Sequence, residues 1–246
     1  MARLPRRLAH DESVTVVEHL DEFRSRLIVS VLALVVAFVG AYIFQENILR
    51  WLADPLPAAR EGKLVTFGVT EPFFTTVKVV FIAAIALSLP VLLWQLWSFL
   101  APAFEENAQR IVAVFVVIAT ALFAGGIAFA YYVILPRALD FLTTYNSDLF
   151  EIQVRASYYY SFVAYSLLAI GLIFNLPIFI LALVRLGVLT SAAIRRNRRI
   201  GIALVVIAAA LLPTVDPVSL VFETVPLLLL FELSIWASVF FECRWQ

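Results

Sequence analysis

Apolar residues along this chain form long runs that alternate with short polar segments. Near the amino end, Val16, Leu20, Phe23 and Leu27 recur at steps of four, three and four residues, which places them on one face of a helix. The apolar run 28–44 follows directly. The pattern predicts an amphipathic helix that continues into a membrane-spanning helix.

Acidic side chains lie off the apolar face of this first helix. Glu18, Asp21 and Glu22 precede Arg24 and Arg26, so the helix holds carboxylates just outside the bilayer. The Glu22–Arg26 pair has i,i+4 spacing, which on a solvated helix surface is worth about 0.2–0.5 kcal/mol. On spacing alone, a simple surface pair is the plainer interpretation, and a binding site is the alternative.

Six apolar segments are predicted to form membrane helices in an all-α polytopic fold. They cover approximately residues 27–44, 72–99, 111–135, 156–184, 200–212 and 218–241. Pro90 is expected to interrupt the second segment, and Gly171 and Pro177 to bend the fourth. The fifth segment has about 13 residues, or about 20 Å, against a hydrocarbon core of about 30 Å. Such a helix must thin the bilayer, lean on protein or leave a polar notch.

The distribution of Lys and Arg predicts the orientation of a single domain, 1–246. Residues 1–26 are expected to be a cytoplasmic segment, and residues 45–75 and 137–155 to be outer loops, the first with an interfacial helix. The inner side would then hold twelve arginines: Arg3, Arg6, Arg7, Arg24, Arg26, Arg110, Arg185, Arg195, Arg196, Arg198, Arg199 and Arg244. The outer side would hold five basic residues: Arg50, Arg60, Lys63, Arg137 and Arg155. Both termini are therefore predicted to be cytoplasmic.

Composition supports an integral membrane protein. Of 246 residues, 63% are hydrophobic and 15% charged, which is more apolar surface than a soluble domain of this length could bury. The 18 basic and 18 acidic residues cancel, so nothing indicates a nucleic-acid partner. The single cysteine, Cys243, excludes an internal disulfide and a cysteine-based metal site. We expect no metal and no cofactor.

Catalytic motifs are absent from the sequence. Both histidines, His10 and His19, precede the first span, and no HExxH motif, paired intramembrane aspartates or glycine-rich phosphate loop occurs. The chain is therefore not expected to be an enzyme.

Several polar residues lie inside or beside the spans, where ionisable groups are costly and usually functional or paired. Lys78 and Asp140 are close enough to helix ends to reach the outer surface. Asn175 precedes a proline, so its amide could satisfy carbonyls that the bend frees. Glu232 lies about nine residues from the inner end of its helix and Glu223 about five from the outer end, so Glu232 is the harder to dismiss.

Six motifs together resemble the TatC family, the multi-span receptor of the twin-arginine protein translocase. They are HLDEFRSRL (19–27), EPFFTTVK (71–78), FLAPAF (99–104), AFAYYVILP (128–136), FNLP (174–177) and DPVS (216–219). The resemblance implies a concave, glove-shaped protein of six spans that binds signal peptides carrying paired arginines. It also implies recruitment of single-span TatA-type and TatB-type subunits, self-association in a Tat complex, and transport of folded proteins driven by the proton-motive force. The implied location is the cell membrane.

The resemblance implies a role for the acidic helix. The family's glutamate at the position of Glu22 helps to form a cytoplasmic patch that receives the arginine pair, because a carboxylate can accept two guanidinium hydrogen bonds and lysine cannot reproduce that geometry. A second family glutamate, six residues after the loop proline, is Ala108 here. We hypothesise that Glu105 or Glu106 supplies that charge. The expected signal-peptide set is Glu22, Arg24, Phe99, Pro102, Glu105 and Glu106.

The same resemblance implies structural or partner-docking positions. These are Pro72, Phe73, Phe74, Lys78, Asn175, Pro177, Leu211, Leu212, Asp216 and Glu232. Asn175 stands where many members carry Glu or Gln, and Leu212 stands where Thr is usual. The short last two helices are expected to dock the single-span partners.

Two functions are alternatives to a translocase receptor. One is a small-solute or ion transporter with Asn175, Glu223 and Glu232 along a midplane pathway, and the other is a scaffold without a substrate.

Overall fold

The computed structural model describes residues 16–57, 64–100, 108–145, 147, 149, 152–185, 187–211 and 217–245. Within these residues the chain is helical apart from short connections and one isolated bridge between Val65 and Arg155. The elements are α1 (Val16–Ile43), α2 (Gln45–Ala53), α3 (Glu71–Leu100), α4 (Ala108–Phe129), a π-helical turn (Ala130–Ile134), α5 (Leu135–Thr144), α6 (Ala156–Ile173), α7 (Leu176–Arg185), α8 (Ser191–Arg196), α9 (Arg198–Ala210) and α10 (Pro217–Trp245).

Five stretches of helix are long and apolar enough to cross a membrane. They are Leu20–Ile43, Glu71–Phe99, Val112–Thr144, Ala156–Arg185 and Glu223–Phe240. The chain is therefore a multi-pass membrane protein. The remaining segment is α9, whose 13 residues match the short length expected for 200–212. The expectation that the last helix is also short is wrong, because α10 has 29 residues. At 1.5 Å per residue α9 is about 20 Å long, so a count of six spans depends on α9 and stays a prediction.

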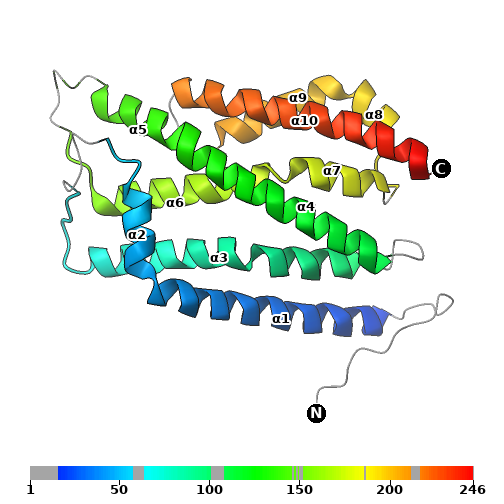
Figure 1. Ribbon diagram of the computed structural model, residues 1–246, viewed down its shortest axis with the longest axis horizontal. Helices are drawn as coiled ribbons and strands as arrows, with labels where there is room; N and C mark the ends of the chain where they lie inside the picture. Colours follow the sequence, from blue (N-terminus) through cyan, green and yellow to red (C-terminus); the bar gives the residue numbers. More distant parts are fainter. Residues whose placement is uncertain are drawn as a thin grey trace, which may run out of the picture.

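The long helices lie side by side, and the molecule has two distinct ends (Figure 1). One end, here called the α1 end, holds the start of α1, the end of α3, the start of α4 and the ends of α7 and α10. The other, the α2 end, holds α2, the end of α5 and the starts of α3 and α6. At this end α2 lies across the bundle, where it contacts α3 and α6.

Side-chain hydroxyls hold α2 against the longer helices. Tyr131 of the π-helical turn donates to the Trp51 carbonyl at 2.8 Å, and Tyr159 of α6 donates to the Leu52 carbonyl at 2.9 Å. The Trp51 and Tyr131 rings stack with centroids 4.2 Å apart. These contacts add hydrogen bonds to carbonyls in the last turn of a short helix, where the regular intrahelical bonding ends.

Three apolar clusters form the interior of the bundle. One joins α3, α5 and α6 beneath α2, the second joins α3, α4 and α7, and the third joins α9 to α10. Only 6% of the α1 span is buried, so α1 packs on α3 and leaves most of its surface open to lipid. The short α9 packs on α10, which is one of the three possibilities raised for a helix of this length.

The helix that begins with α4 runs further than the sequence predicted. The polar outer segment expected to start at residue 137 is helical as far as Thr144. Pro136 lacks an N–H and would clash with the preceding turn of an α-helix. The wider π-helical turn immediately before it accommodates this, with the Leu135 N–H bonded to the Ala130 carbonyl. Likewise, α3 continues through Pro90 without the expected interruption.

The predicted bend in the fourth span is confirmed, and it lies at Phe174–Asn175 between α6 and α7. The Asn175 side-chain N–H donates to the Gly171 carbonyl at 3.1 Å, and the backbone carbonyl of Asn175 accepts from the backbone N–H groups of Ile178 and Phe179. The amide therefore replaces backbone bonds that the break removes. Asn175 is 1% exposed, so this repair takes place inside the bundle.

Candidate functional site

The acidic helix at the α1 end carries the ion pair expected from its spacing. Arg26 donates to Glu22 Oε1 from Nε at 2.9 Å and from Nη2 at 2.5 Å. The Glu22 side chain is 31% exposed and that of Arg26 is 24% exposed. Oε2 of Glu22 accepts no hydrogen bond from the described part of the chain. The carboxylate is thus half satisfied and half available.

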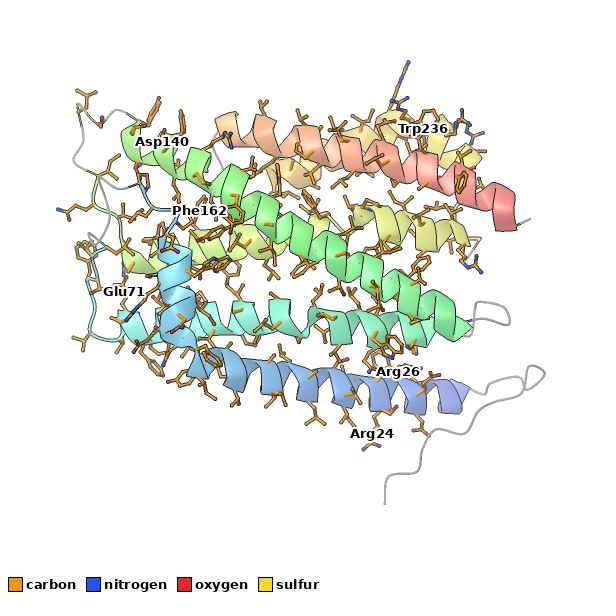
Figure 2. The ribbon with its side chains drawn as sticks, viewed as in Figure 1. Arg24, Arg26, Glu71, Asp140, Phe162 and Trp236 are labelled. Atoms are coloured by element: carbon orange, nitrogen blue, oxygen red, sulfur yellow. The ribbon has the colours of Figure 1, made fainter. Side chains whose placement is uncertain are left out.

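Arg26 and Phe23 join this pair to α3. Arg26 Nη1 lies 3.5 Å from Oε1 of Gln95, at the outer limit of a hydrogen bond, and the Phe23 and Phe99 rings meet edge to face with centroids 5.7 Å apart. Figure 2 shows Arg26 between α1 and α3, while Arg24 points away from the bundle. We call Glu22, Phe23, Arg26, Gln95 and Phe99 the α1–α3 cluster.

The α1–α3 cluster brings together two of the six residues expected to contact a signal peptide. Glu22 and Phe99 belong to it, and Arg24 lies exposed on the same helix but faces elsewhere. Pro102, Glu105 and Glu106 lie outside the described residues. Their connection leaves α3 directly after the cluster, because Leu100 ends that helix.

Gln95 is the member of the cluster whose role the sequence did not indicate. It is a polar residue within the second predicted span, four residues before Phe99, so it shares the helix face of Phe99. That spacing was the available signal. A partner 69 positions away in α1 was not predictable from it.

The opposite end of the bundle carries a second ion pair. Glu71, at the start of α3, accepts two hydrogen bonds from Arg155, at 2.8 Å from Nε and 3.1 Å from Nη2, and one from the Phe67 N–H at 3.0 Å. The bonds to Glu71 raise the pKa of the Arg155 guanidinium. With the Val65–Arg155 bridge, these contacts tie two connections together, and we call this arrangement the α3–α6 clamp. Figure 2 places Glu71 at this end.

Several expected partner-docking residues lie near the clamp. Pro72, Phe73 and Phe74 are exposed on the first turn of α3, and Lys78 is exposed with its Nζ 3.1 Å from Ser161 Oγ of α6. Asp140 is likewise exposed.

The expected positions in the second half of the chain are distributed over different helices. Asn175 and Pro177 lie at the bend between α6 and α7, and Leu211 is exposed after α9. Leu212 and Asp216 lie outside the described residues. Glu232 of α10 accepts a hydrogen bond from Arg198 Nε at 2.7 Å.

The two α10 glutamates differ in burial. Glu223 is 1% exposed, whereas the Glu232 side chain is 27% exposed and paired with Arg198 at the start of α9. This pair depends on how α9 packs on α10, which the sequence alone did not indicate. Among the described residues, no three His, Cys, Asp or Glu side chains are grouped so that they could hold a metal ion.

Comparisons with known proteins identify the family of this chain. The family model for the Sec-independent protein translocase protein (TatC) matches residues 18–226. TatC of Helicobacter pylori strain J99 is 36% identical over 217 residues, covering 88% of this chain and 86% of the relative. TatC of Carboxydothermus hydrogenoformans is 33% identical over 233 residues, covering 94% of this chain and 96% of the relative.

A solved structure has the same fold. A crystal structure of TatC, described as the twin-arginine translocase receptor, aligns with a TM-score of 0.79 and 32% sequence identity. The alignment covers 90% of this chain and 99% of that chain. Sequence and fold therefore agree over nearly the whole length, and the chain belongs to the TatC family, as a multi-pass membrane component of the twin-arginine protein translocase.

Proposed function

We propose that this protein binds twin-arginine signal peptides and recruits single-span TatA-type and TatB-type subunits, so that folded proteins cross the cell membrane at the expense of the proton-motive force. The observation that carries the proposal is the half-available carboxylate of Glu22 at the α1 end. Such a carboxylate can accept hydrogen bonds from an incoming guanidinium group, and these charge-assisted bonds are among the strongest in proteins.

The surroundings of Glu22 suit a peptide in which arginines precede an apolar stretch. Phe23 is half exposed, and its ring lies against Phe99 of α3. An apolar segment following the arginines could pack on these rings while the guanidinium groups remain at the carboxylate. Glu22 at this position is also less screened by salt than a carboxylate in open solution, since it lies at the edge of an apolar span.

Two arginines require more than one carboxylate. Glu105 and Glu106 follow Phe99 by six and seven residues, so the chain itself keeps them within reach of the α1–α3 cluster. We propose that one of them receives the second guanidinium group, and that Pro102 shapes the connection. Arg24, directed away from the cluster, is better suited to the surrounding lipid headgroups or to a partner.

The proposed orientation places the α1 end in the cytoplasm. Exposed arginines on α8 and at the start of α9, namely Arg195, Arg196, Arg198 and Arg199, support this through the preference of basic residues for the cytoplasmic side. With α9 as the sixth and shortest crossing, both termini would be cytoplasmic. The concave arrangement and self-association are proposed from the family resemblance.

The short α9 is proposed as part of the docking face for single-span subunits. Ile200, Leu204 and Ile207 are exposed on it although they are apolar, and Leu211 continues this surface. A partner helix seated there would cover apolar side chains where the helix is too short to match the bilayer.

Site-specific crosslinking tests the signal-peptide proposal. A photoreactive residue in place of Asp21, in the full chain reconstituted in lipid, should crosslink a peptide that carries two arginines before an apolar stretch. Glu22→Gln should reduce that yield roughly tenfold, the effect of losing about 1.4 kcal/mol of binding free energy. Glu46→Gln is the matched control, because Glu46 forms an exposed i,i+4 pair with Arg50 on α2. Undiminished crosslinking to Glu22→Gln would refute the proposal.

A further inference from the structure

The carboxylate proposed to receive an arginine already holds one. Arg26 approaches Oε1 of Glu22 with both Nε and Nη2, at 2.9 and 2.5 Å, which is the type of bond that a signal-peptide arginine would form. An internal guanidinium at this place reduces the negative charge that Glu22 presents and uses part of its hydrogen-bonding capacity.

Arg26 also has an alternative partner. Its Nη1 lies 3.5 Å from the Gln95 side-chain oxygen, and its side chain is 24% exposed to solvent. If Arg26 released Glu22, it could shorten the bond to Gln95 and complete its shell with water. Release would therefore not leave a buried charge without partners, which is the usual large cost of breaking an ion pair.

We propose that Arg26 competes with an incoming arginine for the Glu22 carboxylate. The incoming arginine displaces Arg26 toward Gln95, and this competition sets the affinity of the site for its ligand. The inference rests on the proposed function of Glu22. Its consequence is that binding stays reversible, because the internal guanidinium regains the carboxylate whenever the ligand leaves.

Whether Arg26 competes with the ligand or supports the site decides how ligand affinity changes when the Arg26–Glu22 bond is weakened. If Arg26 serves only to hold Glu22 in position, any substitution of Arg26 lowers ligand affinity. If Arg26 competes, weakening its bond to Glu22 raises affinity. Lysine keeps the positive charge but has no planar fork of donors, so Arg26→Lys weakens the bond without changing the net charge of the cluster.

The test measures binding of a fluorescent twin-arginine peptide to the full chain in lipid nanodiscs. Arg26→Lys and Arg26→Gln should both bind more tightly, by roughly two- to fivefold, the size expected from partly exposed ion pairs. Arg50→Lys, which alters the similar but fully exposed pair with Glu46, should bind as the unmodified protein does. In a Glu22→Gln background, Arg26→Lys should have no effect.

Three outcomes overturn the inference. Weaker binding to Arg26→Lys would show that Arg26 supports the site. Tighter binding to Arg26→Gln alone would show simple repulsion between charges. Tighter binding to Arg26→Lys that persists without the Glu22 carboxylate would place its effect elsewhere. If Glu22→Gln by itself binds normally, the proposed function fails; if Glu22→Gln binds weakly while Arg26→Lys binds normally, only the competition fails.

Discussion

The crossing of α4 and α6 depends on two glycines, Gly126 of α4 and Gly171 of α6. Gly126 and its neighbour Gly125 offer a matched pair of substitutions that tests this crossing. A β-carbon added to Gly126 would lie 2.8 Å from the Cβ and Cγ atoms of Phe174 and 2.9 Å from the Cα atom of Gly171. A β-carbon added to the preceding residue, Gly125, would meet nothing within 4 Å. Ala at 126 therefore tests helix packing, and Ala at 125 tests helix propensity alone.

The expected magnitudes follow from these distances. Carbon atoms in contact are about 3.5–4.0 Å apart, so Gly126→Ala requires a displacement of about 0.7 Å or more. Rotation of the Phe174 side chain leaves its Cβ atom in place, and the Cα atom of Gly171 is backbone, so both contacts are relieved only if α6 moves. Overpacking of this kind costs about 1–3 kcal/mol, offset in part by the advantage of Ala over Gly within a helix, about 0.8–1.0 kcal/mol. Gly125→Ala gains this advantage without a clash.

Thermal unfolding of the purified protein in detergent measures the difference. For a chain of this size, about 1 kcal/mol corresponds to a change in Tm of roughly 2–4 °C. We expect Gly126→Ala to unfold several degrees below Gly125→Ala, which should equal or exceed the unmodified protein. If Gly126→Ala proved as stable as Gly125→Ala, the close approach of α4 and α6 would be refuted.

Two further predictions concern the α9 surface and the α3–α6 clamp. Leu204→Asn places an amide on the exposed apolar face of α9 and should abolish co-purification of single-span subunits. Leu87→Asn, at an equally exposed position of α3, should leave co-purification unchanged. Retention of the subunits by Leu204→Asn would contradict the proposed docking face. Glu71→Gln and Arg155→Lys each remove part of a bidentate ion pair. Cleavage of the 64–70 segment by added protease should therefore accelerate several-fold in either variant. An unchanged cleavage rate would show that the ion pair does not hold the two connections together.

Much of the fold was predictable because its cause is local. Long apolar runs identified the spans, the absence of an N–H at Pro177 located the bend, and i,i+4 spacing predicted the Glu22–Arg26 pair. The short length of α9 was also predictable, because a short apolar run precedes Pro213. Each of these conclusions requires only residues within a few turns of one another.

The side-chain contacts between different helices at the two ends of the bundle were not predictable in the same way. Gln95 meets Arg26, and Arg155 meets Glu71 across 84 positions, because particular faces of two helices turn toward each other. Helix rotation is decided by the whole bundle. The continuation of helix past Pro136 depended on a π-helical turn, a change of one residue in the hydrogen-bond pattern that no periodicity of apolar residues reveals.

The α3 helix has a mechanical consequence, since it joins the clamp at one end of the molecule to the α1–α3 cluster at the other. Its 30 residues form one helix about 45 Å long, with Glu71 in its first turn and Gln95 and Phe99 in its last two turns. The neighbouring α6–α7 pair is jointed halfway and can absorb a push by flexing. A continuous helix transmits a displacement along its axis, so a force on the α1–α3 cluster, where we propose that the signal peptide docks, should reach the clamp at the other end of the bundle.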